Sequence, residues 1–144
     1  AIAIQESDLT ARFQANGGPA RGLWQFERAG VKGVLHHLAT RKLALAVAES
    51  HGLAPMVGTV WSTLASDDRL AAKFARLLLW TDPAPLPTNR PDAWDCYLRT
   101  WRPGKPNWPR STGWRRGFAG SARGPKSFSG PMWTRPWGMG WRLR

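Results

Sequence analysis

The residue of this sequence best suited to acid–base chemistry is Glu6, which follows the apolar run Ala-Ile-Ala-Ile at positions 1–4. A carboxyl group beside apolar surface is poorly solvated, and its pKa rises because the charged form is disfavoured. A glutamic acid that stays protonated near neutral pH can donate its proton to the oxygen of a glycosidic bond. The sequence therefore predicts Glu6 as a catalytic acid.

A second stretch lies close enough in the sequence to help form a site around Glu6. Asn-Gly-Gly-Pro at 16–19 and Gly22 are typical of a loop or short hairpin, and Leu-Trp-Gln-Phe follows them at 23–26. Trp24 could stack on the face of a sugar ring or fill the core, and the sequence does not separate these roles. We expect Arg21 to be a solvated loop cation, the alternative being a partner for a carboxylate of a ligand.

The sequence does not favour a metal or an organic cofactor. Cys96 is the only cysteine, and a structural zinc site needs several clustered ligands. His36, His37 and His51 show no metal-binding spacing, and we expect the first two to lie on the surface. The expected chemistry therefore needs neither a metal nor an organic cofactor.

The elements that must position these residues are mostly helices. Periodic apolar residues and end signals predict helices at about 39–50, 55–64, 68–80 and 92–101, with residues 1–9 as the end of another helix. The glycine-marked segment 30–35 is expected to be a loop. The fold class is therefore mainly α, several short helices around a small glycine-rich hairpin or loop region.

Individual positions in these helices are also predictable. Asp67 is expected to cap the helix at 68–80, and Gly52 to end the helix before it. Ile2, Ile4 and Leu9 are expected to be partly or wholly buried. The other residues expected in the core are Leu43, Ala44, Val47, Ala48, Leu70, Ala71, Phe74, Leu77 and Leu78, with Trp61, Trp80, Trp94 and Trp101 as core aromatic residues.

Charge divides the chain into two parts. Residues 1–106 contain 13 Lys/Arg and nine Asp/Glu, whereas residues 107–144 contain eight Lys/Arg, five Trp and no acid. The first part is long enough for one domain, and we expect the second to be irregular or disordered. This tail could bind nucleic acid, or it could be out-of-frame translation of a GC-rich gene.

The remaining bulk features exclude one class of protein. No segment approaches the roughly 20 apolar residues of a membrane span. The chain opens without Met inside an apolar segment, which indicates that its beginning lies upstream and that any targeting signal would lie there too.

Two short motifs resemble those of a known enzyme family. Glu-Ser at 6–7 and Gly-Leu-Trp-Gln at 22–25 are similar to the Glu-Ser and Gly-Leu-Met-Gln motifs of soluble lytic transglycosylases, in the lysozyme-like superfamily. The stretches at 18–27 and 75–83 also resemble small phage and prophage proteins that degrade peptidoglycan. The resemblance covers residues 1–106 and implies a lysozyme-like (α+β) domain.

The resemblance implies a role for individual residues. Glu6 matches the family's catalytic acid/base, Ser7 the neighbour that steadies it, and Gln25 a glutamine that lines the glycan groove. Tyr97 is the only tyrosine; it is matched to a groove tyrosine, although its helical spacing from Trp94 fits core packing equally well. Trp24 is included as a substrate-binding residue.

The same resemblance implies a reaction, a substrate and a setting. In that family one Glu protonates the leaving oxygen of the MurNAc–GlcNAc bond, then acts as base while the sugar's 6-hydroxyl closes a 1,6-anhydro ring. No second carboxylate is needed, and neither Asp8 nor Glu27 is a convincing one. The implied protein is a phage or prophage enzyme that acts on the periplasmic cell wall, as a monomer or as a virion component.

One departure from the family keeps alternatives open. The Ala-Tyr-Asn-Ala-Gly motif has no match, and Ala-Arg-Leu-Leu-Leu-Trp at 75–80 occupies the corresponding kind of helix. A hydrolytic lysozyme (muramidase) is one alternative. The others are a binding protein for nucleic acid or wall polymer that uses the tail, and an inactive fragment.

Overall fold

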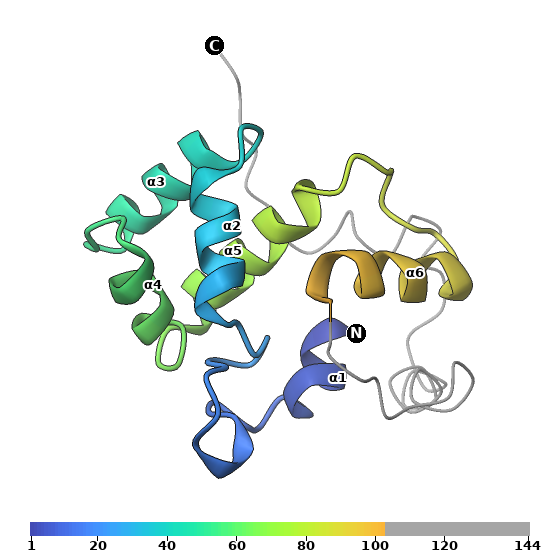
Figure 1. Cartoon of the computed structure of the whole chain (residues 1–144), viewed down its shortest axis with the longest axis horizontal. Helices are drawn as coiled ribbons and strands as arrows, with labels where there is room; N and C mark the ends of the chain where they lie inside the picture. The colour runs from blue at the N-terminus through green and yellow to red at the C-terminus, as the bar shows by residue number, and fades with distance from the viewer. Residues whose placement is uncertain (103–144) are drawn as a thin grey trace, which may run out of the picture.

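The computed structural model describes residues 1–102, and the tail at 107–144 lies outside this range. The described chain is mainly helical and contains no β-strand beyond isolated bridges. In chain order the helices are α1 (Ile2–Ser7), the short 3-10 helix η1 (Ala15–Gly17), α2 (Arg28–His36), α3 (Arg41–Ser50), α4 (Val57–Thr63), α5 (Asp68–Trp80) and α6 (Arg90–Trp101). Figure 1 shows α2 to α5 gathered on one side and α1 with α6 on the other. No described helix is long and apolar enough to cross a membrane.

The larger hydrophobic cluster joins α2, α3, α4 and α5. Its large, fully buried side chains include Val31 and Val34 from α2, Val60 from α4, and Leu70 and Phe74 from α5. Helix α3 contributes Ala44 and Ala48, whose small side chains allow close approach to α2 and α5. The predicted core stripe of α5 is thus confirmed, with Leu78 partly buried.

The ends of α3 and α5 follow their predicted signals. The carboxylate of Asp67 accepts a hydrogen bond from the Leu70 N–H at 2.9 Å, which satisfies one of the free donors of the first turn. Gly52 has a φ of 70° just after α3, and the N–H of Leu53 bonds the Ala48 carbonyl at 3.0 Å. This is the glycine-terminated helix end that the sequence predicts.

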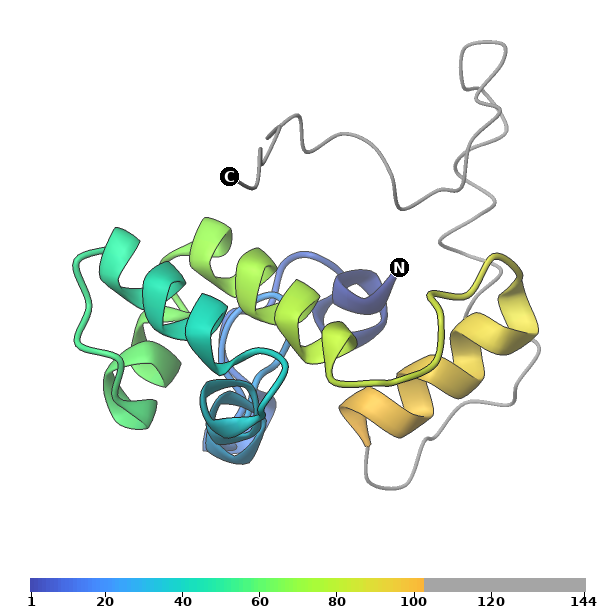
Figure 2. The same cartoon turned by 90° about the horizontal axis from the view of Figure 1, so that it is seen from above.

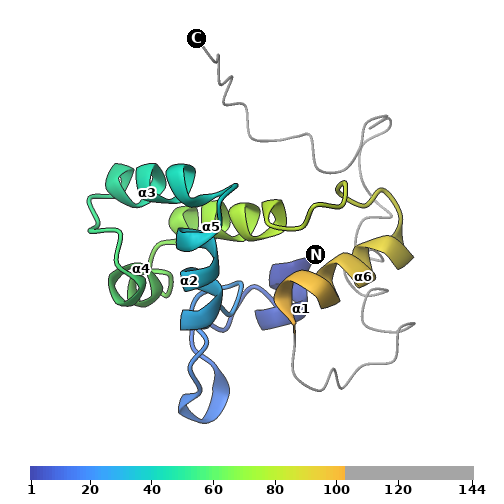
Figure 3. The ribbon, with the colours of Figure 1, turned by 45° about the horizontal axis from the view of Figure 1, so that its top comes forward.

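A smaller hydrophobic cluster joins α1 to α6. Ile2, Trp94 and Tyr97 are buried together, and Trp24 and Trp101 pack against both clusters. Figure 3 shows α6 crossing beside α1, and Figure 2 shows the long 81–89 connection that carries the chain from α5 to α6. The two tryptophans therefore link the α1–α6 side to the rest of the fold.

The prediction of a loop at 30–35 is wrong, because this segment forms most of α2. Val31, Val34 and Leu35 lie at helical spacing and are all buried, and this burial outweighs the low helix propensity of glycine. Gly30 also allows close packing, since a Cβ there would lie 3.3 Å from the Phe26 ring.

Three predicted core residues are exposed instead. Trp80 is 52% exposed at the end of α5, where the Arg76 guanidinium covers its ring at 5.5 Å. Leu9 and Leu43 are 53% and 45% exposed. Leu9 has a φ of 58° just past α1, so it follows the turn outward and leaves the helix face. Leu43 lies beside the buried face of α3 that Ala44 and Ala48 already fill.

The glycine-rich segment between α1 and α2 is a compact irregular loop. Arg21 forms single antiparallel bridges to Phe13 and to Phe26, with both N–H to O distances between Arg21 and Phe26 at 2.8–2.9 Å. This matches the predicted small hairpin or loop region. Gly22 must be glycine, since its φ is 72° and a Cβ would lie 2.2 Å from the Leu64 carbonyl oxygen.

Candidate active site

Glu6 lies in the last turn of α1 and is half-buried against α6. The hydroxyl of Tyr97 donates a hydrogen bond to Glu6 Oε1 at 2.5 Å, across 91 positions of sequence. Tyr97 is only 4% exposed, and its ring packs on Trp94 with centroids 5.3 Å apart. Tyr97 is therefore a core residue, and its hydroxyl is directed at the candidate acid.

Burial and the tyrosine act on the Glu6 pKa in opposite directions. Burial raises it and is the larger effect, while the hydrogen bond from Tyr97 lowers it, so the net pKa lies above the ordinary value. The pKa of Tyr97 is raised strongly, first by burial and then by the bond to Glu6 and its charge. Tyr97 consequently keeps its proton at any ordinary pH and is a permanent donor to Glu6.

Ser7 connects the Glu6 helix to the glycine-rich loop. Its buried hydroxyl lies 2.7 Å from the Leu23 carbonyl oxygen and 3.0 Å from the Ala3 carbonyl oxygen. One hydroxyl proton is shared between these two acceptors. Ser7 thus steadies α1 from the backbone side while Tyr97 holds Glu6 from the side-chain side.

Gln25 and Trp24 hold the loop in shape. Gln25 has a φ of 48°, and its amide nitrogen donates to the carbonyls of Gly22 at 2.9 Å and Ala11 at 3.2 Å. Trp24 is half-buried against both hydrophobic clusters. These contacts make Trp24 a packing residue and direct the Gln25 donors to the backbone.

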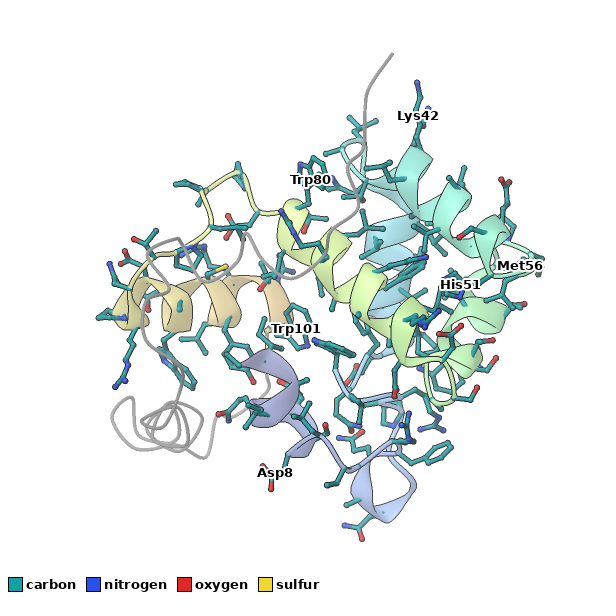
Figure 4. The ribbon with its side chains drawn as sticks, turned by 180° about the vertical axis from the view of Figure 1, so that it is seen from behind. Asp8, Lys42, His51, Met56, Trp80 and Trp101 are labelled. Carbon is teal, nitrogen blue, oxygen red and sulfur yellow. The ribbon has the colours of Figure 1, made fainter. Side chains whose placement is uncertain are left out.

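The sequence predicted only a packing role for Trp101, but Trp101 also forms a hydrogen bond to the loop. Its indole N–H donates to the Trp24 carbonyl at 3.0 Å, which fixes the end of α6 to the loop. Figure 4 shows Trp101 at the junction between α6 and the body formed by α2 to α5. Its helical spacing from Tyr97 was the only available signal, and it could not reveal a partner 77 positions away.

The other acids do not join Glu6. Asp8 is exposed in a left-handed conformation at the end of α1, and its side chain points away from the helices in Figure 4. Glu27 is exposed at the start of α2. Within residues 1–102 the Glu6 carboxylate bonds no side chain except Tyr97, and no three potential metal ligands cluster. His36 and His37 are exposed, as expected.

A small apolar hollow lies next to the site. It has a free volume of about 20 Å³ and is lined by Ile2, Leu79, Leu86, Pro87, Ala93, Cys96 and Tyr97. Such a volume holds about one water molecule and cannot admit a sugar ring. A large ligand would therefore have to contact Glu6 from its exposed side.

The arrangement as a whole is a protonatable carboxyl, held by one permanent donor and carried on a helix fixed by one serine. It can give a proton to a bound group and take one back, with Tyr97 stabilising the charged state in between.

Comparison with models of protein families, with characterised proteins and with solved structures finds no match to this chain.

Proposed function

We propose that this protein cleaves the glycan strands of peptidoglycan, with Glu6 as general acid and then general base. The observation that carries the proposal is the Tyr97–Glu6 hydrogen bond at 2.5 Å on a half-buried carboxyl whose pKa burial raises. A raised pKa increases the protonated fraction near neutral pH, and that fraction is what a glycosidic oxygen needs. The choice of peptidoglycan as substrate rests on the motifs at 6–7 and 22–25, which resemble those of lytic transglycosylases.

The first step follows from the state of Glu6. The protonated carboxyl transfers its proton to the oxygen between MurNAc and GlcNAc, and the bond from that oxygen to the anomeric carbon breaks with its electron pair on the oxygen. Glu6 is then a carboxylate, and the Tyr97 hydroxyl stabilises this charge by the bond that it already makes. Tyr97 is a positioning residue, because it acts on the substrate only through Glu6.

The second step returns the proton. The Glu6 carboxylate removes the proton of the sugar's 6-hydroxyl, and that oxygen attacks the anomeric carbon to close a 1,6-anhydro ring. This route uses one carboxyl group, which fits a site where Asp8 and Glu27 are exposed and unconnected to Glu6. A retaining or inverting hydrolase usually needs a second carboxylate about 5–10 Å away. The transglycosylase outcome is therefore preferred to hydrolysis.

The test is an incubation of purified sacculi with the full chain and with Glu6→Gln, followed by mass spectrometry of the released muropeptides. We expect anhydro-muramoyl ends from the wild type and none from the variant. Glu6→Gln is a suitable variant because the amide keeps the shape and can still accept the Tyr97 hydrogen bond through its oxygen.

The other outcomes identify the alternatives. Release of reducing ends would make the protein a lysozyme, and equal release from both chains would exclude Glu6 as the acid. No release from either chain would refute the enzyme proposal. Deleting residues 107–144 should leave the product unchanged if the tail takes no part in cleavage, whereas a binding protein that works through the tail would lose its polymer.

A further inference from the structure

A second group of residues around Trp61 combines exposed aromatic surface with fixed positive charge. The Arg21 guanidinium carbon lies 4.6 Å from the centroid of the Trp61 ring, and that of Arg28 lies 4.3 Å from it. Arg21 also lies over the ring of Phe13, at 5.3 Å, and Phe13 is 62% exposed. We call Phe13, Arg21, Arg28 and Trp61 the Trp61 cluster.

The rings and the backbone hold the cluster in place. The Trp61 indole N–H donates to the carbonyls of Pro19 at 3.0 Å and Phe26 at 3.1 Å, so the ring is fixed to the loop. One guanidinium nitrogen of Arg21 donates to the carbonyls of Gly18 at 2.7 Å and Ala20 at 2.9 Å. The expectation of a solvated Arg21 is therefore wrong, because stacking and loop carbonyls hold its side chain.

The positive charge of the cluster has no acidic partner in the described chain. Two other arginines do form ion pairs, Arg12 with Asp68 and Arg99 with Asp82. Among residues 1–102 neither Arg21 nor Arg28 lies within 4.0 Å of a carboxylate, and Arg28 is exposed and stacks on Trp61. Stacking uses the face of a guanidinium and leaves the N–H groups at its edge free to bind an anion.

The position of the cluster connects it to Glu6. Arg21 lies in the same loop as Leu23, whose carbonyl receives the Ser7 hydroxyl next to Glu6. The loop that carries Arg21 therefore also fixes the end of the helix that carries Glu6. The cluster places two guanidinium groups beside the exposed ring of Phe13.

We propose that the Trp61 cluster binds the carboxylates of the peptide stems of peptidoglycan, with Arg28 as the main contact and Arg21 as its fixed neighbour. The choice of this polymer rests on the proposed function. The guanidinium edge of Arg28 forms paired N–H···O bonds to a carboxylate, and the exposed Phe13 ring covers an apolar part of the stem. The cluster thus holds the strand while Glu6 meets the glycan.

The test measures binding without cleavage. Full-length Glu6→Gln, and the same chain carrying Arg28→Ala, Arg28→Lys or Lys42→Ala, are sedimented with purified sacculi over a range of protein concentrations. Lys42 is the matched control, since it is exposed on α3 and its side chain forms no hydrogen bond or ion pair within the described residues; Figure 4 shows it at the end of the body opposite the glycine-rich loop. A second set of sacculi has its carboxylates converted to neutral amides.

We expect Arg28→Ala to weaken binding to untreated sacculi about three- to tenfold. Arg28→Lys should fall between, because lysine keeps the charge but loses the planar fork. Lys42→Ala should change binding by less than twofold, and on amidated sacculi Arg28→Ala should match its parent. Circular dichroism of each variant checks that α2, which begins at Arg28, still forms.

Three results would overturn the inference. In the first, Arg28→Ala binds untreated sacculi as well as its parent, or no worse than Lys42→Ala does. In the second, the loss of binding caused by Arg28→Ala persists on amidated sacculi. In the third, Arg28→Ala loses more binding to single-stranded DNA than to sacculi, which would assign the cluster to nucleic acid instead. Failure of the proposed function is a separate result, because a chain that releases no muropeptide can still show Arg28-dependent binding to wall carboxylates.

Discussion

Removing the hydroxyl of Tyr97 should destabilise this protein more at neutral pH than in acid. Tyr97→Phe keeps the buried ring and its packing on Trp94, so the change is confined to the bond with Glu6. When Glu6 is charged the variant leaves a half-buried carboxylate without its only side-chain partner in the described chain. When Glu6 is protonated it leaves only a neutral group.

The size of the effect follows from the kind of bond. A hydrogen bond to a charged group contributes about 1.5–3 kcal/mol to stability, and a neutral one about 0.5–1.5 kcal/mol. Because Glu6 is partly exposed, we take the lower part of each range. The expected loss is about 1.5 kcal/mol near pH 8 and about 0.5 kcal/mol near pH 4.

The sign of the Glu6 contribution is fixed by its raised pKa. A carboxyl whose pKa in the folded protein lies above its ordinary value of 4.5 contributes stability that is fully present below pH 4.5. That stability is lost as the pH rises through the folded pKa. Glu6→Gln should therefore become more stable relative to the wild type over this window, and Tyr97→Phe should raise the Glu6 pKa further.

The assay is a double-mutant cycle of Glu6→Ala, which removes the acceptor of the bond, and Tyr97→Phe, with urea unfolding of the four proteins near pH 4 and near pH 8. The cycle isolates the coupling of the two side chains because changes shared by the corners cancel. A coupling below about 0.3 kcal/mol at both pH values would refute the bond. A coupling that does not grow with pH would refute the charged state that the mechanism needs.

Four further variants test the supports of the site and of the fold by urea unfolding. Ser7→Ala should cost about 1–2 kcal/mol, since it leaves a carbonyl of the loop without its donor. Gly22→Ala should cost at least 3 kcal/mol, roughly, because its Cβ would lie 2.2 Å from a backbone oxygen, whereas Gly17→Ala, at the same φ of 72° in open space, should cost about 1 kcal/mol. Asp67→Ala should cost about 1 kcal/mol at neutral pH; burial raises the pKa of Asp67 but its hydrogen bonds lower it more, so this cost should vanish as the pH falls below 3.8. Equal losses for the two glycine variants, or a pH-independent loss for Asp67→Ala, would contradict these structural accounts.

The sequence predicted helices well where apolar periodicity and end signals agreed. For α5 the capping Asp67 and the buried face from Leu70 to Leu77 are both local features, and its bounds are the predicted ones. In α2 the two signals disagreed. Gly30 and Gly33 favoured a loop, whereas the helical spacing of the buried residues Val31, Val34 and Leu35 favours the helix that forms. The helical pattern placed Trp80 in the core, but Trp80 is the last residue of α5 and is 52% exposed, with Arg76 stacked on its ring.

The candidate site was predictable only in part, because its contacts are long-range. The apolar run before Glu6 correctly indicated a raised pKa, since neighbours on one helix turn are close in sequence and in space. The bond from Tyr97 and the tie from Trp101 to Trp24 cross 91 and 77 positions, and no local pattern specifies them. The sequence did predict that Tyr97 lies on a helix with an apolar face. It could not predict that this helix packs beside the one that carries Glu6.

The geometry of the site depends on contacts outside the helix that carries Glu6. A helix of six residues, as α1 is here, is too short to be stable alone, so α1 is held by its packing partners. Ile2 fixes one end in the α1–α6 cluster, Ser7 fixes the other to Leu23, and Tyr97 fixes the side chain of Glu6 itself. The loop and α6 are joined in turn by Trp101, which bonds the Trp24 carbonyl. These contacts come from α6 and from the glycine-rich loop, so the carboxyl acquires its raised pKa and its donor only after α1 has packed against both.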